Sequence, residues 1–313
     1  MKTNILLTSA GGLTGVYLAK HLSQFSDLNI IAIDMNENTP LNKWTDKFYV
    51  VPSLSSNLYL AAIDEIIKTN CIDIIIPVTS YDVAFYSLYK DQALFNKLKI
   101  LTVNFEDNEI LSNKEKLYSY LSSLKIQTPL IYHEDNLIYP CFMKPKIGSG
   151  SKNTQILFDY EELEYWSKKF REFIVMEYLE GSEYTVDCLF DWESNCLGYN
   201  VRERIKVSNG GATITQNNTT IDICEIIEKL EKTKKIIGPI NFQFKLKNNG
   251  DIVIFDFNTR FASGGLPLTI HSGFDIPRNL IDLLQGKTIN KFVMDGKYNS
   301  SKMIRFYDEY FVD

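Results

Sequence analysis

The apolar positions of the first hundred residues fall into short continuous runs that alternate with longer amphipathic stretches. The runs at residues 4–8, 29–33, 72–77 and 99–103 have the length of buried strands. The stretches between them carry apolar residues at helical spacing, as residues 58–69 do. Strands that are buried on both faces and separated by helices are typical of a parallel sheet. The pattern therefore predicts a Rossmann-like α/β unit.

The pattern changes near residue 104. A helix is expected over residues 113–125, and strand-like segments follow it, separated by polar or glycine-containing turns. The expected strands are residues 141–144, 155–158, 173–178, 184–190 and 196–206, with weaker strand character around 303–307, and the expected helices are 161–169 and 223–236. This order predicts a mixed α+β region whose strands are largely antiparallel.

The clearest hairpin lies near residue 248. Residues 240–246 and 251–257 read as strands joined by a turn that contains Asn-Asn-Gly, a strong turn signal. A closed turn places Gln243 opposite Ile254 and diagonal to Asp256, at a backbone separation of roughly 7–8 Å. Side chains of this length can converge on a shared cation across that distance.

The second strand of the hairpin carries a polar face that suits a metal ion. With a period of two, Asp256, Asn258 and Arg260 share one face, and Phe255 lies on the opposite one. Together with Gln243, the carboxylate and amide oxygens are hard donors that suit Mg²⁺ held jointly with phosphates. Arg260 is placed to bind an anion bidentately. The alternative interpretation is a polar sheet face that is exposed to solvent.

Composition and charge narrow the function classes. The chain has 313 residues, of which 45% are hydrophobic and 23% charged, as in a soluble globular protein of two or three subdomains. The net charge of −6, without a block of basic residues, does not favour a nucleic-acid or membrane surface. No apolar run approaches the about eighteen residues of a membrane-spanning helix, and the start is too short for a secretory signal. We therefore expect a cytoplasmic protein.

The cysteines and histidines do not indicate a zinc site or a catalytic nucleophile. The five cysteines form no closely spaced pair, which indicates buried thiols in a reducing compartment. The three histidines lie far apart in the sequence, so a zinc site is not favoured. No nucleophile-elbow pattern supports a Ser-His or Cys-His system.

The first of two glycine-rich stretches, at residues 11–15, lies between a predicted strand and a predicted helix. Such a turn can bind phosphate, and Asp34 ends the next strand as a ribose-binding acid does in dinucleotide-binding folds. The spacing does not match G-x-G-x-x-G, however, so a tight strand-to-helix turn is the favoured interpretation. An NAD(P)-linked oxidoreductase remains as the alternative function.

The second stretch places Lys144 at the end of a strand and follows it with Gly148, Ser149, Gly150 and Ser151. Small residues let backbone N–H groups approach phosphate oxygens, and a lysine supplies a positive charge. The alternative is a mobile hairpin tip with solvent-exposed lysines.

Cations also alternate along a later strand, at Arg202, Arg204 and Lys206. A triphosphate or an acyl phosphate would relieve their mutual repulsion. The alternative is a solvated basic edge that discourages aggregation. Between these features, residues 175–184 run out of a strand into a turn, where an exposed strand end can pair with the edge of an adenine.

In this order, the features resemble the ATP-grasp superfamily, whose members include the carbamoyl-phosphate synthetase large subunit, D-alanine–D-alanine ligase and biotin carboxylase. The resemblance covers nearly the whole chain. Asn241 and Gln243, followed by Asp256, Asn258 and Arg260, resemble the family's N-x-Q and E-x-N-x-R signature. Asp256 stands where the family usually has glutamate, which leaves the number of bound metal ions open.

The resemblance implies a set of nucleotide-binding residues. It comprises the lysines Lys114 and Lys144, the lid residues Gly148, Ser149, Gly150 and Ser151, the adenine-binding residues Glu177, Tyr178 and Leu179, and Glu183 and Arg202 for the ribose and a phosphate. It also implies catalytic roles for Arg260, Arg204 and Lys144, metal coordination by Gln243, Asp256 and Asn258, and an acceptor loop at residues 263–265. The implied cofactors are ATP and Mg²⁺, with Mn²⁺ as an alternative ion.

The implied fold combines α/β and α+β parts. A Rossmann-like pre-ATP-grasp domain (residues 1–104) precedes an ATP-grasp fold made of a lid subdomain (105–183) and a C-terminal subdomain (184–313). The implied activity is that of a ligase which activates a carboxylate as an acyl phosphate and joins it to an amine. An ATP-binding protein without ligase chemistry and a kinase are the alternatives. The implied partners are a small carboxylate, an amine and a second copy in a homodimer.

Overall fold

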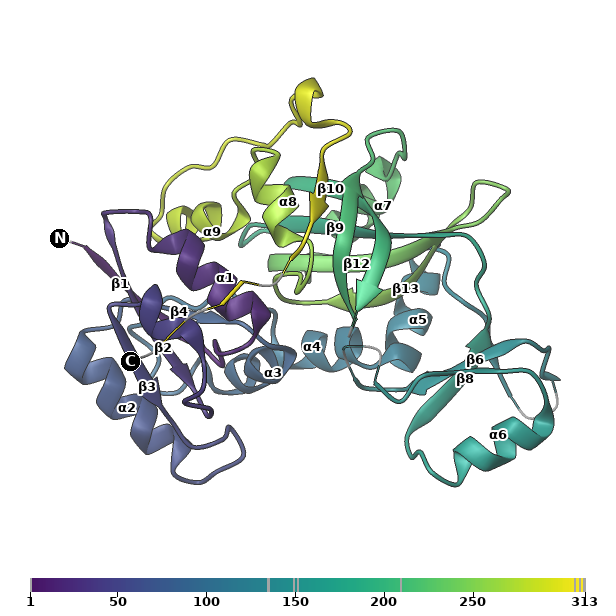
Figure 1. Ribbon diagram of the computed structural model, residues 1–313, viewed down its shortest axis with the longest axis horizontal. Helices are drawn as coiled ribbons and strands as arrows, with labels where there is room; N and C mark the ends of the chain where they lie inside the picture. Colours follow the sequence, from purple (N-terminus) through teal and green to yellow (C-terminus); the bar gives the residue numbers. More distant parts are fainter. Residues whose placement is uncertain are drawn as a thin grey trace.

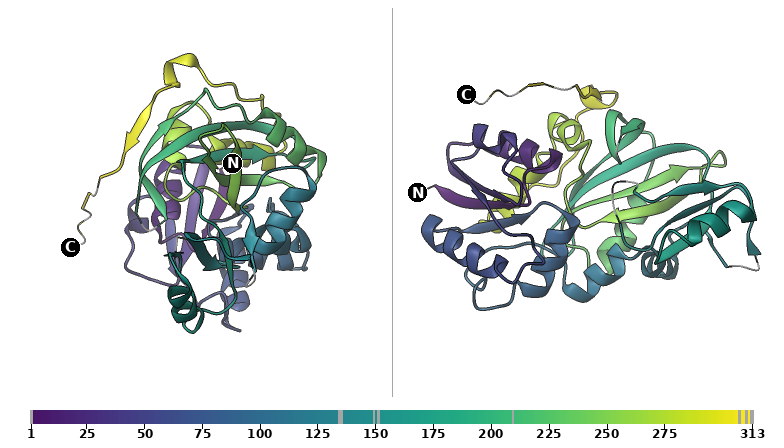
Figure 2. Two further views of the ribbon diagram at one scale, coloured as in Figure 1. Left: turned by 90° about the vertical axis from the view of Figure 1, so that its right-hand side faces the viewer. Right: turned by 60° about the horizontal axis from the view of Figure 1, so that its bottom comes forward.

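The strands form three sheets in the part of the chain that the computed structural model describes, which comprises residues 2–133, 136–148, 150, 152–208, 210–306, 308–309 and 311 (Figure 1). The N-terminal α/β unit lies at one end of the molecule, a six-stranded sheet lies in the middle, and a small four-stranded sheet lies at the other end (Figure 2). The predicted combination of α/β and α+β parts is confirmed.

The N-terminal sheet is parallel, as predicted, and has the spatial order β3-β2-β1-β4. Its strands are β1 (Thr3–Thr8), β2 (Leu28–Asp34), β3 (Lys47–Val50) and β4 (Ile74–Pro77). One face is covered by α1 (Leu13–Leu22) and α9 (Ile276–Leu284), and the other by α2 (Tyr59–Asn70) and α3 (Ser80–Tyr89).

Alternation along β1 explains these two layers, because successive side chains of a strand point to opposite faces. Ile5 and Leu7 share a core cluster with Leu18 of α1 and Ile281 of α9. Leu6 belongs instead to the cluster formed with α2 and α3. Helix α9 therefore completes the N-terminal layer although it lies late in the sequence. The domain boundaries at residues 104 and 183 stay predictions.

The strand predicted at residues 99–103 is wrong. In the described chain, Lys99 forms one parallel bridge with Ile74, and the chain then leaves the sheet. Leu101 and Val103 are nevertheless buried, Leu101 in the N-terminal core and Val103 in the core of the middle sheet. The apolar run therefore reflects burial between two parts of the molecule and not membership of a strand.

The other two sheets are antiparallel, as predicted. The middle sheet has the order β13-β12-β9-β10-β11-β14, with β9 (Ser182–Phe190), β10 (Cys196–Ser208), β11 (Gly211–Asn217), β12 (Gly238–Leu246), β13 (Ile252–Asn258) and β14 (Lys302–Ile304). The end sheet has the order β5-β8-β6-β7, with β5 (Ile131–Tyr132), β6 (Cys141–Pro145), β7 (Gln155–Leu157) and β8 (Phe173–Glu177).

Within the described residues, five further helices connect these strands, and the sequence pattern indicated three of them. The helices are α4 (Phe105–Ser112), α5 (Lys114–Ser123), α6 (Tyr160–Ser167), α7 (Cys224–Lys232) and α8 (Leu266–His271). Helices α4, α8 and α9 were not predicted, and neither were strands β3, β5 and β11. Among the described residues, no helix has both the length and the apolar character needed to cross a membrane.

The β12–β13 hairpin forms as predicted, but its predicted register is wrong. Gln243 pairs directly with Asp256, and the next pair joins Phe244 to Ile254. Phe255 is therefore an extra residue, a bulge that no glycine announces in the sequence. The bulge also reverses the alternation, so that Ile254 enters the core and Phe255 lies on the same side as Asp256, against the prediction.

Candidate functional site

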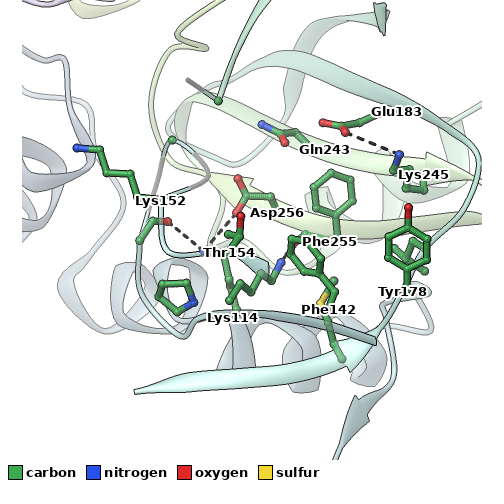
Figure 3. Close-up of a pocket in the computed structure, with 17 residues that line it drawn as sticks. Lys114, Phe142, Lys152, Thr154, Tyr178, Glu183, Gln243, Lys245, Phe255 and Asp256 are labelled. Atoms are coloured by element: carbon green, nitrogen blue, oxygen red, sulfur yellow. Dashed lines mark hydrogen bonds and ion pairs between the residues drawn. The ribbon is translucent and has the colours of Figure 1, made fainter. Parts of the chain in front are cut away.

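Ends of the end sheet and the middle sheet converge on one cavity of about 260 Å³ (Figure 3). One wall comes from β6 and β8 and the residues that follow them, and the opposite wall comes from β9, β12 and β13. The principal lining residues are Lys114, Phe142, Lys144, Gly148, Gly150, Met176, Tyr178, Leu179, Glu183, Gln243, Lys245, Phe255 and Asp256. Most of the nucleotide-binding residues expected from the sequence thus surround a single space.

Lys114 enters this cavity from the start of α5. The side chain of Asn113 caps that helix by accepting backbone hydrogen bonds from Glu115 and Lys116, which fixes where the helix begins. The Lys114 Nζ donates to the Gly148 carbonyl at 3.0 Å and lies 3.5 Å from Asp256 Oδ1. One lysine therefore links the loop after β6 to the hairpin of the middle sheet.

Lys144 is 4% exposed and donates a 2.8 Å hydrogen bond from Nζ to the Phe255 carbonyl. The bulge releases this carbonyl from regular pairing, and the Tyr118 hydroxyl also donates to it, at 2.8 Å. Burial lowers the pKa of Lys144 to about 7, while Asp256 acts in the opposite direction. A phosphate in the cavity would stabilise the charged form of this lysine.

The predicted metal ligands lie together at the β12–β13 hairpin. Gln243 and Asp256 are direct cross-strand partners, and Asn258 is two residues further along the same strand. The Asn258 Nδ2 donates to Asp256 Oδ2 at 3.1 Å and to Asn241 Oδ1 at 3.3 Å, so its own Oδ1 is the atom that can serve a cation.

This donor set fits Mg²⁺ shared with phosphates. No group of three or more His, Cys, Asp and Glu side chains among the described residues could hold a metal alone. The set at Gln243, Asp256 and Asn258 consists of two amide oxygens and one carboxylate, which are hard donors with a single negative charge. A divalent ion here would need further oxygens from a polyphosphate. Mg²⁺ is commonly bound in this way.

Glu183 and Arg204 form an ion pair at the edge of the cavity. The Arg204 Nε lies 2.8 Å from Glu183 Oε1, and Lys245 Nζ lies 3.9 Å from Glu183 Oε2. Arg204 also donates to the Gly210 carbonyl at 3.0 Å. Glu183 lines the main cavity and Arg204 lines a smaller recess beside it, but each already has a partner of opposite charge.

Arg202 has a different environment, although it is two residues from Arg204. It is 1% exposed and pairs with Asp187 through Nε and Nη2, at 2.8 and 3.1 Å. Thr269 donates to the same carboxylate. The structure thus gives Arg202 a buried partner, and its role in phosphate binding stays a prediction.

A smaller polar recess of about 30 Å³ adjoins the main cavity and shares Gln243 and Asp256 with it. Arg260 lines it together with residues 263–265, the predicted acceptor loop. Gly265 packs tightly against the Arg202 guanidinium, because a Cβ there would lie 2.1 Å from Arg202 Cζ. The recess therefore opens beside the main cavity at Gln243 and Asp256, two of the predicted metal ligands.

The predicted adenine and lid segments are only partly placed at the cavity. Tyr178 and Leu179 line it, whereas the Glu177 carboxylate pairs with Lys247 at 2.5 Å and is not among the lining groups. Gly148 lines it, as Gly150 does. The predicted lid residues Ser149 and Ser151 lie outside the described residues.

The sequence analysis did not predict several of the residues that line the cavity. Phe142 lies two residues before Lys144 on the same strand, and Met176 two residues before Tyr178, so alternation alone could have placed both. Phe255 could not have been found in this way, because the bulge places it on the lining side.

The carboxylate of Asp34 is bound by the first glycine-rich turn, at residues 11–15. Asp34 Oδ2 accepts from the Gly11 N–H at 2.7 Å, and Oδ1 accepts from the Asn36 N–H at 2.9 Å. A Cβ at Gly11 would lie 2.7 Å from Asp34 Cγ, so the turn is closed tightly on this carboxylate. The geometry favours the tight-turn interpretation over a ribose-binding acid.

Two family models match the chain. Residues 169–303 match the family described as ATP-grasp in the biosynthetic pathway with Ter operon, and residues 5–103 match the PylC-like N-terminal domain. The carbamoyl phosphate synthase large chains of Caldanaerobacter subterraneus subsp. tengcongensis and Thermoanaerobacter pseudethanolicus are 25% and 26% identical over 231 and 221 residues. These matches cover 66% and 63% of this chain but 21% and 20% of the relatives, so the chain spans about a fifth of their length.

Solved structures share the fold over almost the whole chain. The biotin carboxylase domain dimer of Hydrogenobacter thermophilus 2-oxoglutarate carboxylase, determined with MgADP and bicarbonate, has a TM-score of 0.73 at 14% identity, over 92% of this chain and 70% of that one. N5-carboxyaminoimidazole synthetase from Staphylococcus aureus, determined with ADP, has a TM-score of 0.71 at 16% identity, over 93% of this chain and 80% of that one. The L-amino acid ligase from Bacillus licheniformis has a TM-score of 0.68 at 16% identity, over 91% of this chain and 74% of that one.

At such identities the solved structures establish a common fold and no common activity. The family models add sequence evidence in both halves of the chain, and the carbamoyl phosphate synthase relatives agree with them. Together, these matches and the shared fold support the ATP-grasp superfamily for this chain.

Proposed function

We propose that the protein is an ATP- and Mg²⁺-dependent ligase that activates a substrate carboxylate as an acyl phosphate and joins it to an amine. One observation carries the proposal. Lys114, Lys144 and the metal-donor set Gln243, Asp256 and Asn258 come from separate parts of the sequence and surround adjoining spaces. Two cations and a set of hard oxygen donors in one cleft are what a nucleotide triphosphate with a divalent ion needs.

The proposed reaction has two steps. A carboxylate oxygen of the substrate attacks the γ-phosphorus of ATP, the bond from that phosphorus to the bridging oxygen breaks, and ADP leaves with that oxygen. The amine nitrogen then attacks the acyl carbon, phosphate leaves, and the amine releases a proton. No nucleophile of the protein is required, which agrees with the lack of a Ser-His or Cys-His pattern in the sequence.

The residues of this chain would act by position and charge. Lys114 and Lys144 would bind phosphate oxygens, and Arg260 would hold the phosphoryl group as it passes to the acid. Mg²⁺ bound by Gln243, Asp256 and Asn258 would neutralise charge on the phosphates. Mn²⁺ prefers similar oxygen donors, so its use in place of Mg²⁺ is part of the proposal.

The substrates are proposed by class only. An amino acid, a peptide or a sugar acid would supply the carboxylate, as the resemblance to the ATP-grasp superfamily implies, and the similar L-amino acid ligase supports the first of these. A homodimer is proposed as well, because the similar biotin carboxylase domain is described as a dimer. Sedimentation of the purified chain tests that proposal.

Release of ADP from MgATP, measured against a panel of carboxylates with and without amines, tests the function. Asp256→Asn removes the charge from the metal-donor set and should lower ADP release at least about a hundredfold. Asp251→Asn is the matched control, because Asp251 lies at the turn of the same hairpin, where Asn249 contacts it. Equal activity of the two variants would contradict the proposed site.

The alternative of an ATP-binding protein without chemistry gives a different result. It predicts calorimetric binding of MgATP that depends on Asp256 but no ADP release with any acid and amine. A kinase would release ADP with an acid alone and leave a stable phosphorylated product, whereas the proposed ligase forms an amide only when the amine is present.

A further inference from the structure

The guanidinium of Arg260 is held on one side by two neutral oxygens. Its Nε donates to the Ser80 hydroxyl at 2.9 Å, and its Nη1 donates to the Phe261 carbonyl at 2.8 Å. These two bonds fix the plane of the group, and the remaining terminal nitrogen is available to the recess that Arg260 lines. Phe261 is the next residue in the chain, whereas Ser80 belongs to the N-terminal unit.

Ser80 is itself held in place. It is the first residue of α3, whose N-terminus is closed by a reciprocal pair of bonds between Thr79 and Asp82. The Asp82 carboxylate is fully buried and also accepts a 2.8 Å hydrogen bond from the Ser9 hydroxyl, at the end of β1. The segment that carries Ser80 is thereby tied to the end of β1 through Asp82.

The hydroxyl of Ser80 is a neutral partner for Arg260, which affects the charge of the guanidinium. A carboxylate in the place of Ser80 would hold the arginine equally well but would cancel its charge. A hydroxyl fixes the direction of the guanidinium and leaves its positive charge to an incoming anion.

We propose that Ser80 is a positioning residue that aims the Arg260 guanidinium at the transferred phosphoryl group. The inference rests on the proposed function for what Arg260 binds, but the contact itself does not depend on it. The N-terminal unit then takes part in the chemistry through a bond between residues that lie 180 positions apart. Nothing in the sequence around Ser80 indicates this role.

Nitrogen-15 spectra of the arginine Nε–H groups test the contact directly, and the chain has only six arginines. Arg260→Lys identifies the Arg260 signal. In the wild type this proton should exchange slowly with water, and Ser80→Ala should accelerate its exchange at least about tenfold, because the acceptor is lost. Ser80→Thr keeps the hydroxyl and should restore protection. An Arg260 signal that Ser80→Ala leaves unchanged would overturn the proposal.

Binding of inorganic phosphate in the presence of MgADP tests the consequence. Ser80→Ala should weaken phosphate binding about tenfold and leave MgADP binding within about twofold of the wild type. Ser87→Ala on the same helix is the control, because the Ser87 hydroxyl bonds only to the Ala84 carbonyl in the described structure. Ser80→Cys, with a weak acceptor, serves as a second variant if Ser80→Ala does not fold.

The outcomes separate the two proposals. If the wild type binds MgADP and phosphate but Ser80→Ala matches it in both, the positioning role is wrong and the proposed function stands. If the wild type binds no adenine nucleotide, the proposed function fails, and the exchange of the Arg260 proton still decides whether Ser80 holds the arginine.

Discussion

The Nζ of Lys144 lies 2.8 Å from the carbonyl oxygen of Phe255, the residue that the bulge removes from the pairing of β12 with β13. The same bulge leaves Gln243 and Asp256 as direct partners. One local irregularity therefore places a buried lysine and the proposed metal donors around the same space. Because this lysine has a pKa of about 7, its charge depends on what binds beside it.

Binding of MgATP should take up a proton at Lys144. At pH 8 the free protein holds most of this lysine in its neutral form, since burial lowers its pKa to about 7. Bound phosphates favour the charged form and raise that pKa, so uptake should approach about one proton at pH 8 and fall toward zero at pH 6. Calorimetry in buffers of different ionisation enthalpy measures this number.

Two variants control that measurement. Lys144→Met should abolish the uptake at pH 8, whereas Lys116→Met, which changes an exposed lysine of the same region, should leave it intact. Uptake that persists in Lys144→Met would assign the proton to another group.

The same pKa predicts a pH-dependent effect on stability. Between about pH 7 and the ordinary lysine pKa of 10.5, the unfolded chain binds a proton at residue 144 that the folded chain does not. The free energy of unfolding of the wild type therefore rises with pH relative to that of Lys144→Met. From pH 6.5 to 9.5 the difference between the two proteins should change by about 3 kcal/mol, as measured by urea unfolding. A constant difference would contradict the lowered pKa.

The strands with a clear local pattern in the sequence were predicted, and a strand without one was missed. The strands β1, β2 and β4 were predicted because their side chains are buried on both faces and form unbroken apolar runs. Strand β11 was missed because buried and half-buried side chains alternate irregularly along it. The polar face that includes Asp256 and Asn258 was predicted because it interrupts an apolar strand with unusual residue types.

What the sequence could not provide were contacts between distant segments. The bulge at Phe255 depends on how β13 pairs with β12, and no residue type marks it. The bond from Arg260 to Ser80 joins two units that are far apart in the chain. Arg202 and Arg204 look equivalent in a strand with period two, but their partners, Asp187 and Glu183, differ in burial.

Arg202 should contribute mainly to stability. Arg202→Leu leaves the buried Asp187 carboxylate without its bidentate partner, which should cost roughly 3–5 kcal/mol of unfolding free energy. Replacing both residues, as Arg202→Leu with Asp187→Leu, removes both charges and should recover much of this loss. Arg171→Leu, at an exposed position, is the control. Equal losses in the single and double variants would show that the unpaired charge is not the cause.

The contact between Gly210 and Gly150 predicts how the loop after β6 closes over the cavity. A Cβ at Gly210 would lie 2.5 Å from the Gly150 Cα, and both glycines line the cavity. Gly210→Ala should therefore hold the loop away and weaken MgATP binding about tenfold or more. Its positive φ of 74° also strains an alanine, which should cost about 1 kcal/mol of stability.

Gly250→Ala separates these two effects. Gly250 has a similar φ of 91°, but its Cβ would meet nothing within 4 Å, and it lies at the turn of the β12–β13 hairpin. Both variants should lose a similar unfolding free energy in urea titrations, because both force alanine into the left-handed region. Only Gly210→Ala should lose affinity for MgATP in calorimetry. If the two variants bound MgATP equally, the approach of Gly150 to Gly210 would have no part in closing the proposed nucleotide site.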